Sequence, residues 1–375
     1  MLRIVLASFL VAGSIVVAGS ATAPAAVCGS WGAQPPQAGT GDDLIFAVDG
    51  TSSCDVWMVG NYDSGGPDRT LIEHWGGTGW KVQPSPNAHG RNFLNGVAAV
   101  SPGLAWVVGS HDGTTTDSRT LIERWNGKTW RIQTSPSIGT GFNGLFAVGA
   151  TSATNAWAVG ERYATTSYRA LILHWNGRAW KVQQVPDPSG QDFELRGVTA
   201  TSATNAWAVG IANDATLILH WNGKAWKRQP SPNVGSLMNE LWAVSAASAK
   251  SVWAVGDVYD GTRTHTLVLH WNGTAWKVQA SPSPSADPYS DVLYGVAATG
   301  AGAWAVGDAS DSHGTSTLIL RWTGTTWVRQ PTPNVDLTVP YNNTLIAVAA
   351  ISSSSAWAVG TYSGSPLRPL ALHCC

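Results

Sequence analysis

Short apolar runs alternate with turn-forming residues along almost the whole chain. One stretch shows the pattern: an apolar run at 145–148, a turn at 151–155, Ala-Trp-Ala-Val-Gly at 156–160, a variable loop, and another apolar run at 170–175. The runs are rich in β-branched and aromatic residues and are separated by Gly, Asn, Ser and Pro. These features predict β-strands and not helices.

The same unit recurs at intervals of roughly fifty residues, a period typical of supersecondary units that each bury a face against the next. Asn-Gly pairs at 126–127, 176–177, 222–223 and 272–273 supply the positive φ angles of tight hairpins. Four strands per unit and seven units predict an all-β fold, a seven-bladed β-propeller with four antiparallel strands per blade. The Trp of the second predicted strand marks each unit: Trp57, Trp106, Trp157, Trp207, Trp253, Trp304 and Trp357.

The two ends of the chain predict how the fold closes. The last unit stops at Cys375 without its fourth strand, and the segment 31–35 matches the fourth strand at 80–84. We therefore expect the N-terminal strand to complete the last blade, which closes the ring and removes an exposed sheet edge. An open β-solenoid is the alternative architecture, but it would not bring the two ends together.

Tryptophan is unusually frequent, with 21 residues in the chain. Three Trp positions per unit account for all of them except Trp242, which lies outside the pattern, and Cys374 stands where one more Trp is expected. Large aromatic side chains can bury roughly 150–250 Å² each. We interpret the repeated Trp residues as packing between blades and not as platforms for stacking sugars.

Charge and composition narrow the range of partners. The formal net charge is −1 and 12% of residues are charged, so the chain lacks the basic surface of a nucleic-acid-binding protein. Arg3, the apolar stretch 4–18 and Ala21-Thr22-Ala23 are typical of a secretory signal peptide, and the apolar stretch is too short for a membrane span. We expect residues 1–23 to be removed and residues 24–375 to form one monomeric domain, secreted or at the cell surface.

Four cysteines in an exported protein suggest disulfide bonds. Aligning the units places Cys28 near Cys374 and Cys375, and a bond from Cys28 to either would lock the two ends together. Cys54, in a turn between the first two strands, pairs with the remaining C-terminal cysteine or stays free. No cysteine pair has the spacing of a zinc site, so we expect no metal there.

The predicted channel lining offers little chemistry. The innermost strands carry small residues, as at 97–99 and 296–298, and Asp49 is the only carboxylate near that lining. Acid–base catalysis in the channel would need two convergent carboxylates or a histidine. We therefore expect no cofactor and no enzyme site in the channel, although short acidic loops such as 257–261 could bind calcium weakly.

A histidine precedes the central Trp in several units, and Arg124 and Arg321 replace it in two. Because Arg is not a usual metal ligand, this exchange favours a structural hydrogen-bond donor that caps nearby carbonyls. The repeated histidines are His74, His174, His220, His270 and His373.

The units differ mainly in two sets of loops, those between the second and third strands and those between successive units. In a propeller both sets open on the same face, and variable loops on a rigid scaffold commonly bind ligands. The candidate ligand-binding residues on this face are His111, Asp112, Tyr163, Tyr168, Asp214, Tyr259, Asp260, Asp311, His313 and Tyr362.

The phrases Ala-Trp-Ala-Val-Gly, Leu-His-Trp-Asn-Gly and Trp-Lys-Val-Gln-Pro recur over residues 28–375. This repeat resembles the Trp-rich tandem repeats of β-propeller proteins exported by bacteria, particularly actinobacteria and similar soil bacteria. The resemblance implies the fold but no activity, because propellers carry many unrelated functions.

Three functions are compatible with the sequence. The favoured hypothesis is a non-catalytic binding propeller that recognises a carbohydrate or a protein through the variable loops. The second is an extracellular polysaccharide-active enzyme, a glycoside hydrolase or lyase, that uses the loop carboxylates Asp112, Asp260 and Asp311. The third is a cell-surface scaffold.

Overall fold

The computed structural model describes residues 30–37, 41–113, 117–164, 166–186, 192–300, 302–335, 340–352, 355–364 and 366–375. Within these ranges the secondary structure consists of 28 strands and no helix. Accordingly, the described residues include no helix long and apolar enough to cross a membrane. The expected signal peptide at 1–23 and Cys28 lie outside these ranges.

Each repeated unit forms a blade, a group of four antiparallel strands, and five blades are separate sheets. Their strands are β2 (Asp43–Ser52), β3 (Asp55–Tyr62), β4 (Arg69–Trp75) and β5 (Trp80–Val82); β6 (Asn92–Ser101), β7 (Leu104–Asp112), β8 (Ser118–Trp125) and β9 (Trp130–Ile132); β10 (Asn143–Ser152), β11 (Asn155–Ala164), β12 (Ser167–Trp175) and β13 (Trp180–Val182); β14 (Phe193–Ser202), β15 (Asn205–Ala212), β16 (Ala215–Trp221) and β17 (Trp226–Arg228); β18 (Asn239–Ser248), β19 (Ser251–Tyr259), β20 (Thr264–Trp271) and β21 (Trp276–Gln279).

The other eight strands form one sheet in the order β1-β28-β27-β26-β24-β23-β22, with β25 paired to β24. They are β22 (Asp291–Thr299), β23 (Gly302–Asp311), β24 (Gly314–Trp322), β25 (Trp327–Arg329), β26 (Tyr341–Ser352), β27 (Ser355–Tyr362), β28 (Arg368–Cys374) and β1 (Trp31–Ala33).

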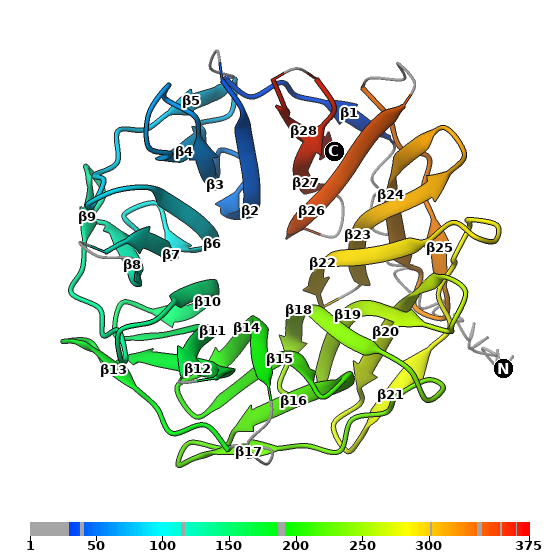
Figure 1. Ribbon diagram of the computed structural model, residues 1–375. Coiled ribbons are helices and arrows are strands. Elements are labelled where there is room, and N and C mark those ends of the chain that lie inside the picture. Colours follow the sequence, from blue (N-terminus) through cyan, green and yellow to red (C-terminus); the bar gives the residue numbers. More distant parts are fainter. Residues whose placement is uncertain are drawn as a thin grey trace, which may run out of the picture.

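Two observations describe how this larger sheet is assembled. A parallel pairing of only two residue pairs, Gly314 with Tyr341 and Thr315 with Asn342, joins β24 to β26. The expected N-terminal strand is β1, and it pairs antiparallel with β28, Trp31 lying opposite Cys374. In Figure 1 the sheets surround a common centre, and the first strand of each unit is innermost.

Tryptophan side chains fill the interfaces between neighbouring blades, as expected. Trp157 is completely buried, and its ring lies 5.0 Å from the rings of both Trp221 and Trp226 in the next blade. The equivalent contact joins the last unit to the first, because Trp357 lies 4.8 Å from Trp75 and 5.0 Å from Trp80. Burial of large aromatic rings at each interface makes a rigid frame.

The repeated histidines are structural, although their partners differ from those expected. His174 stacks on Trp157 with ring centroids 4.0 Å apart, and its Nε2 lies 2.9 Å from Asn155 Oδ1. The partner is therefore a side chain of the turn. The carbonyl of that turn, at Ala153, instead accepts a hydrogen bond of 3.0 Å from the indole of Trp175.

Two of the four cysteines are free in the structure, Cys54 and Cys375. Cys54 therefore stays free, one of the two alternatives predicted for it, and Cys375 does not form the bond to Cys28 that was considered. The sulfur of Cys54 lies against Gly77 of its own unit, and Cys375 is exposed after the end of β28. A bond between Cys28 and the buried Cys374 involves a residue outside the described ranges and remains a prediction.

Candidate ligand-binding site

Each innermost strand carries a β-bulge close to its beginning. In β2 the pairing with β3 shifts between Ile45 and Ala47, so that the residue between them, Phe46, has no partner across the pair. A bulge bends its strand and re-aims the side chain of the extra residue. The equivalent residues of the seven innermost strands are Phe46, Asn95, Phe146, Arg196, Trp242, Tyr294 and Ile346.

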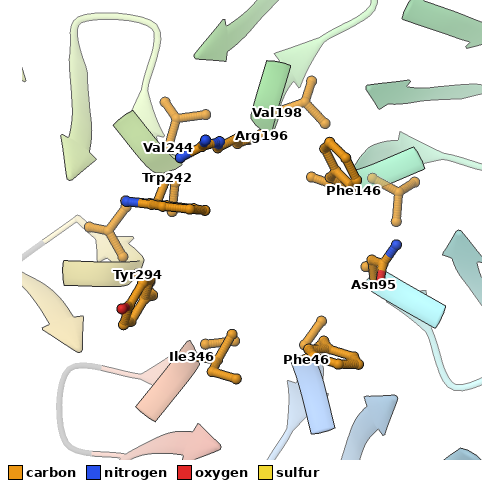
Figure 2. Close-up of a pocket in the computed structure, with 18 of the residues that line it drawn as sticks. Phe46, Asn95, Phe146, Arg196, Val198, Trp242, Val244, Tyr294 and Ile346 are labelled. Atoms are coloured by element: carbon orange, nitrogen blue, oxygen red, sulfur yellow. The ribbon is translucent and has the colours of Figure 1, made fainter. Parts of the chain in front are cut away.

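These seven bulge residues surround one cavity at the centre of the molecule, which we call the channel pocket (Figure 2). Its volume is about 650 Å³, within the range of pockets that hold small ligands. The valines that follow the bulges, among them Val198 and Val244, add to its wall. The surface of the pocket is therefore mainly apolar and aromatic.

Small residues such as Val97 and Val296 line the channel as expected, but that expectation is incomplete. The bulges direct one large side chain per unit toward the centre, and Glu194 also lines the pocket, so Asp49 is not the only carboxylate there. Strand alternation alone does not reveal these positions, because the extra residue interrupts the period of two. One feature of the sequence could have indicated a large side chain in the channel: Trp242 is the Trp that falls outside the repeat pattern.

Asp49 has a structural role in the channel, three residues after the bulge residue Phe46 on β2. Its Oδ1 accepts a hydrogen bond of 2.9 Å from the main chain of Gly50, and its Oδ2 accepts one of 2.9 Å from Ala99 on the neighbouring innermost strand. Burial raises the pKa of Asp49 to about 6. The carboxylate thus links two blades at their inner edges.

Arg196 organises one side of the pocket. Its Nη1 donates a hydrogen bond of 2.6 Å to Glu240 Oε2, and its guanidinium also forms an ion pair with Glu194. The guanidinium carbon lies 3.6 Å from the ring centroid of Trp242, so the cation covers one face of the indole. Two carboxylates and one aromatic ring therefore hold this side chain in place.

The polar atoms of Trp242 and Tyr294 point away from the pocket (Figure 2). Trp242 Nε1 donates a hydrogen bond of 2.8 Å to Asp257 Oδ1, and the ring of Tyr294 meets Trp242 edge-on with centroids 5.5 Å apart. Figure 2 shows the indole nitrogen and the Tyr294 hydroxyl directed away from the pocket centre. The ring carbons are thus what a ligand meets.

Carboxylates lie behind this aromatic side of the pocket. Burial raises the pKa of Asp257 to about 7 and that of Asp308 to about 6, and Asp308 Oδ2 accepts a hydrogen bond of 3.1 Å from Thr344. The pKa of Glu161 is raised to about 8, mainly by burial and to a smaller extent by a hydrogen bond to Glu194 and the charge of that residue. Burial and then the charges of Asp308, Asp257 and Glu240 also raise the pKa of Tyr294.

The two sets of variable loops lie at the same end of the strands. Main-chain hydrogen bonds join them, for example from Asp112 to Arg91 (2.9 Å) and from Tyr163 to Phe142 (2.7 Å). This is also the end at which the innermost strands begin, close to the bulges. The loops that carry the candidate residues therefore lie at the same end as the bulges, but none of the ten candidates lines the channel pocket.

The three loop carboxylates considered for catalysis are not brought together. Asp112 pairs with Arg91 at 3.0 Å, and it lies at the end of β7. Asp260 lies in the β19–β20 hairpin, where it accepts hydrogen bonds from the main chain of Thr262 and Arg263. Asp311 ends β23. Asp260 and Asp311 stabilise their own hairpins, whereas Asp112 links the end of β7 to the segment before β6.

The partners of these loop carboxylates include one other candidate, His313. His265 Nε2 lies 2.7 Å from Asp260 Oδ2, and the bonds to Thr262, Arg263 and His265 lower the pKa of Asp260. Asp311 accepts hydrogen bonds from the main chain of His313 and from the Tyr341 hydroxyl. Among the described residues no group of three or more His, Cys, Asp or Glu side chains is placed to hold a metal ion.

The remaining candidates divide between surface cavities and the core. Tyr168 and Asp214 line a cavity of about 340 Å³, and the Tyr163 ring lies 5.1 Å from Tyr168. Tyr259 and Asp260 line a separate cavity of about 480 Å³. His111 Nδ1 lies 2.8 Å from the Asp112 carbonyl, and Tyr362 packs against the core.

No protein-family model and no curated protein matches this chain. Among solved structures it is similar to YCF48 bound to a D1 peptide, with a TM-score of 0.57 and 14% identity over 94% of this chain and 98% of that one. YCF48 from Cyanidioschyzon merolae has a TM-score of 0.55 and 16% identity over 92% of this chain and 98% of that one. The extracellular domain of BT4673 from B. thetaiotaomicron has a TM-score of 0.56 and 10% identity over 90% of this chain and 39% of that one. These likenesses, together with the four-stranded blades around a centre, identify the fold as a repeat β-propeller.

Proposed function

We propose that this chain is a non-catalytic β-propeller that binds a protein partner, and that the channel pocket receives an apolar side chain of that partner. The observation that supports this most directly is the ring of seven bulge residues, of which Phe46, Phe146, Trp242, Tyr294 and Ile346 are apolar or aromatic. Concave apolar pockets with a few fixed polar groups are the usual form of a binding site.

The hydrogen bonding of the ring favours a peptide over a carbohydrate. A sugar needs partners for several hydroxyl groups, because each unpaired hydroxyl would cost free energy when buried. Several polar groups of the pocket already have partners within the protein. Arg196 is paired with two carboxylates, and the Trp242 nitrogen donates to Asp257. Asn95 Nδ2 donates a hydrogen bond of 2.9 Å to the Leu145 carbonyl. An apolar side chain needs no hydrogen-bond partners when it is buried.

For the scaffold we propose seven blades in a closed ring. The short parallel pairing between β24 and β26 is a natural boundary between two blades of the eight-stranded sheet. Contact of Trp357 with Trp75 and Trp80 supports closure between the last and first units. Closure would fix the bulge residues relative to one another, and a preorganised site loses less free energy when it binds.

Two further points belong to this proposal. YCF48 has been solved with a D1 peptide, so a protein of similar fold binds a peptide. A location outside the cell rests on residues 1–23 and agrees with the fold likeness to an extracellular domain.

A peptide-display library tests the proposal. We expect the purified chain to enrich peptides that share a large apolar residue, and Trp242→Ala to abolish that enrichment. Binding to a polysaccharide array without peptide enrichment would favour the carbohydrate-binding hypothesis instead. Release of new reducing ends or unsaturated products from the same polysaccharides would favour an enzyme.

A further inference from the structure

A second cavity lies beside the channel pocket, between the third and fourth blades. This side groove, of about 340 Å³, is lined by Tyr168 at the start of β12 and by residues of β14 and the β15–β16 turn. Glu194 lines both the side groove and the channel pocket. The two cavities are therefore neighbours, with Glu194 between them.

The side groove combines an apolar wall with negative charge. Phe193 and Ile211 line it, and the ring of Tyr168, which is 41% exposed, lies at its edge. Three carboxylates also line it, those of Asp192, Glu194 and Asp214.

One nearby cation, Arg196, neutralises Glu194, but it does not pair with the other two carboxylates of the groove. Arg196 is paired with Glu194 and Glu240, and Arg169 lines a different cavity, where its guanidinium lies 5.7 Å from the Phe193 ring. Within the described ranges, neither Asp192 nor Asp214 forms an ion pair with Lys, Arg or His.

Local structure holds these two carboxylates at the groove. Asp192 Oδ1 accepts a hydrogen bond of 2.7 Å from the main chain of Tyr168, which joins the two blades. Asn213 and Asp214 adopt φ angles of 52° and 59°, the left-handed conformation of a tight hairpin turn, so that Asp214 is exposed. The charge is therefore presented by a turn of fixed geometry.

We propose that the partner binds as an extended segment, with its apolar anchor in the channel pocket and a lysine or arginine in the side groove. This inference rests on the proposed function and adds the charge of the ligand. An extended chain advances about 3.3 Å per residue. Because both cavities share Glu194, the basic residue would lie one or two positions from the anchor.

The test uses a peptide library with one fixed phenylalanine and two randomised positions on each side. We expect lysine or arginine to be enriched at one of the randomised positions. The best peptide is then compared with its glutamine-substituted form by fluorescence polarisation, and we expect the basic form to bind about fivefold more tightly at low salt. That advantage should shrink as sodium chloride is added.

Two variants locate the effect. Asp192→Asn combined with Asp214→Asn removes two charges but keeps the acceptor oxygens, so it should bring the two peptides to nearly equal affinity. Asp63→Asn is the matched control, because Asp63 is exposed in the β3–β4 hairpin of another blade and its Oδ1 accepts a hydrogen bond from Gly65. The control should keep the preference for the basic peptide.

The outcomes separate the two proposals. Enrichment of apolar residues without lysine or arginine would overturn the charged-groove inference and leave the proposed function intact. A preference for basic residues that persists in the Asp192→Asn and Asp214→Asn double variant would also overturn it. If the library yields no binding peptide at all, the proposed function itself is wrong.

Discussion

Trp242 on β18 is held in place by Asp257 on the adjacent strand β19, through a hydrogen bond of 2.8 Å from the indole nitrogen to Oδ1. Arg196 of the neighbouring blade covers one face of the same indole. A side chain fixed from two directions loses little conformational entropy when a ligand arrives. Trp242 is thus the residue of the pocket whose replacement is most informative.

Trp242→Ala should weaken peptide binding at least about tenfold while changing stability modestly, because the ring lines a cavity. Trp157→Ala removes the same atoms from a fully buried interface and should cost about 3–5 kcal/mol of unfolding free energy. Urea unfolding and peptide affinity, measured on both variants, provide the comparison. Equal destabilisation by the two substitutions would contradict the assignment of Trp242 to a site.

Asp257 is expected to act as a positioning residue. Asp257→Asn keeps an oxygen that can accept from the Trp242 indole, so peptide affinity should stay within about threefold of the native value. Asp257→Leu removes the acceptor and should lower the affinity further, although the melting temperature is maintained because a buried acid is replaced by an apolar side chain. If both variants bind equally well, the hydrogen bond does not orient Trp242.

Two buried glutamates occupy equivalent positions in the first two blades, but only one has a donor. Glu73 Oε2 accepts a hydrogen bond of 3.0 Å from the main chain of Gln37. At the equivalent of Gln37 the second unit has Pro86, which has no N–H. Among the residues that the structure describes, neither oxygen of Glu123 has a hydrogen-bond partner. Burial raises the pKa of Glu123 from 4.5 to about 8.

Glu123→Leu should therefore stabilise the protein, and the gain should depend on pH. Below pH 4.5 Glu123 is protonated in both the folded and the unfolded chain, and its contribution to the free energy of unfolding is fully present. As the pH rises, Glu123 ionises first in the unfolded chain, so the free energy of unfolding falls until the group also ionises in the folded protein near pH 8. The gain from the substitution should be smallest near pH 4.5, grow up to about pH 8 and then level off, reaching a few kcal/mol.

Melting temperatures from pH 4.5 to 9 check this expectation. Glu123→Gln is the control for size, because it removes the charge and leaves polar atoms buried; its gain should be smaller than that of the leucine variant. A gain of the same size at every pH would mean that Glu123 is not protonated in the folded protein.

Removal of residues 1–37 should destabilise the last blade. Without β1, the outer edge of β28 would be exposed, Trp304 would lose its ring contact with Trp31, and Glu73 would lose the hydrogen bond from Gln37. We expect a lower melting temperature and concentration-dependent association through the open edge, seen by light scattering. A truncated chain that is monomeric and equally stable would contradict the proposed closure.

The strands, their order and the structural Trp residues could be predicted, because a repeat shows the same local pattern several times. The pairing of β1 with β28 could also be predicted, from the match between 31–35 and 80–84. These features depend on local composition and periodicity, which a sequence displays directly.

The lining of the pocket could not be predicted in the same way. Which side chain faces the centre depends on how β2 pairs with β3, and a bulge at Phe46 changes that relationship without changing the apolar character of the strand. The loop carboxylates were misleading for a related reason: Asp260 and Asp311 are suited to binding and also to closing hairpin turns.

The bulge positions line the pocket, whereas the paired positions of the same strands hold the sheet together. The extra residue of each innermost strand lies outside the strand pairing, so its identity can change while the strand order remains the same. A single architecture can thus present many different combinations of seven side chains to incoming molecules. Substituting only these positions would produce a family of receptors with new preferences, and a designer could begin with Phe46, Phe146 and Ile346, which carry no polar partners to replace.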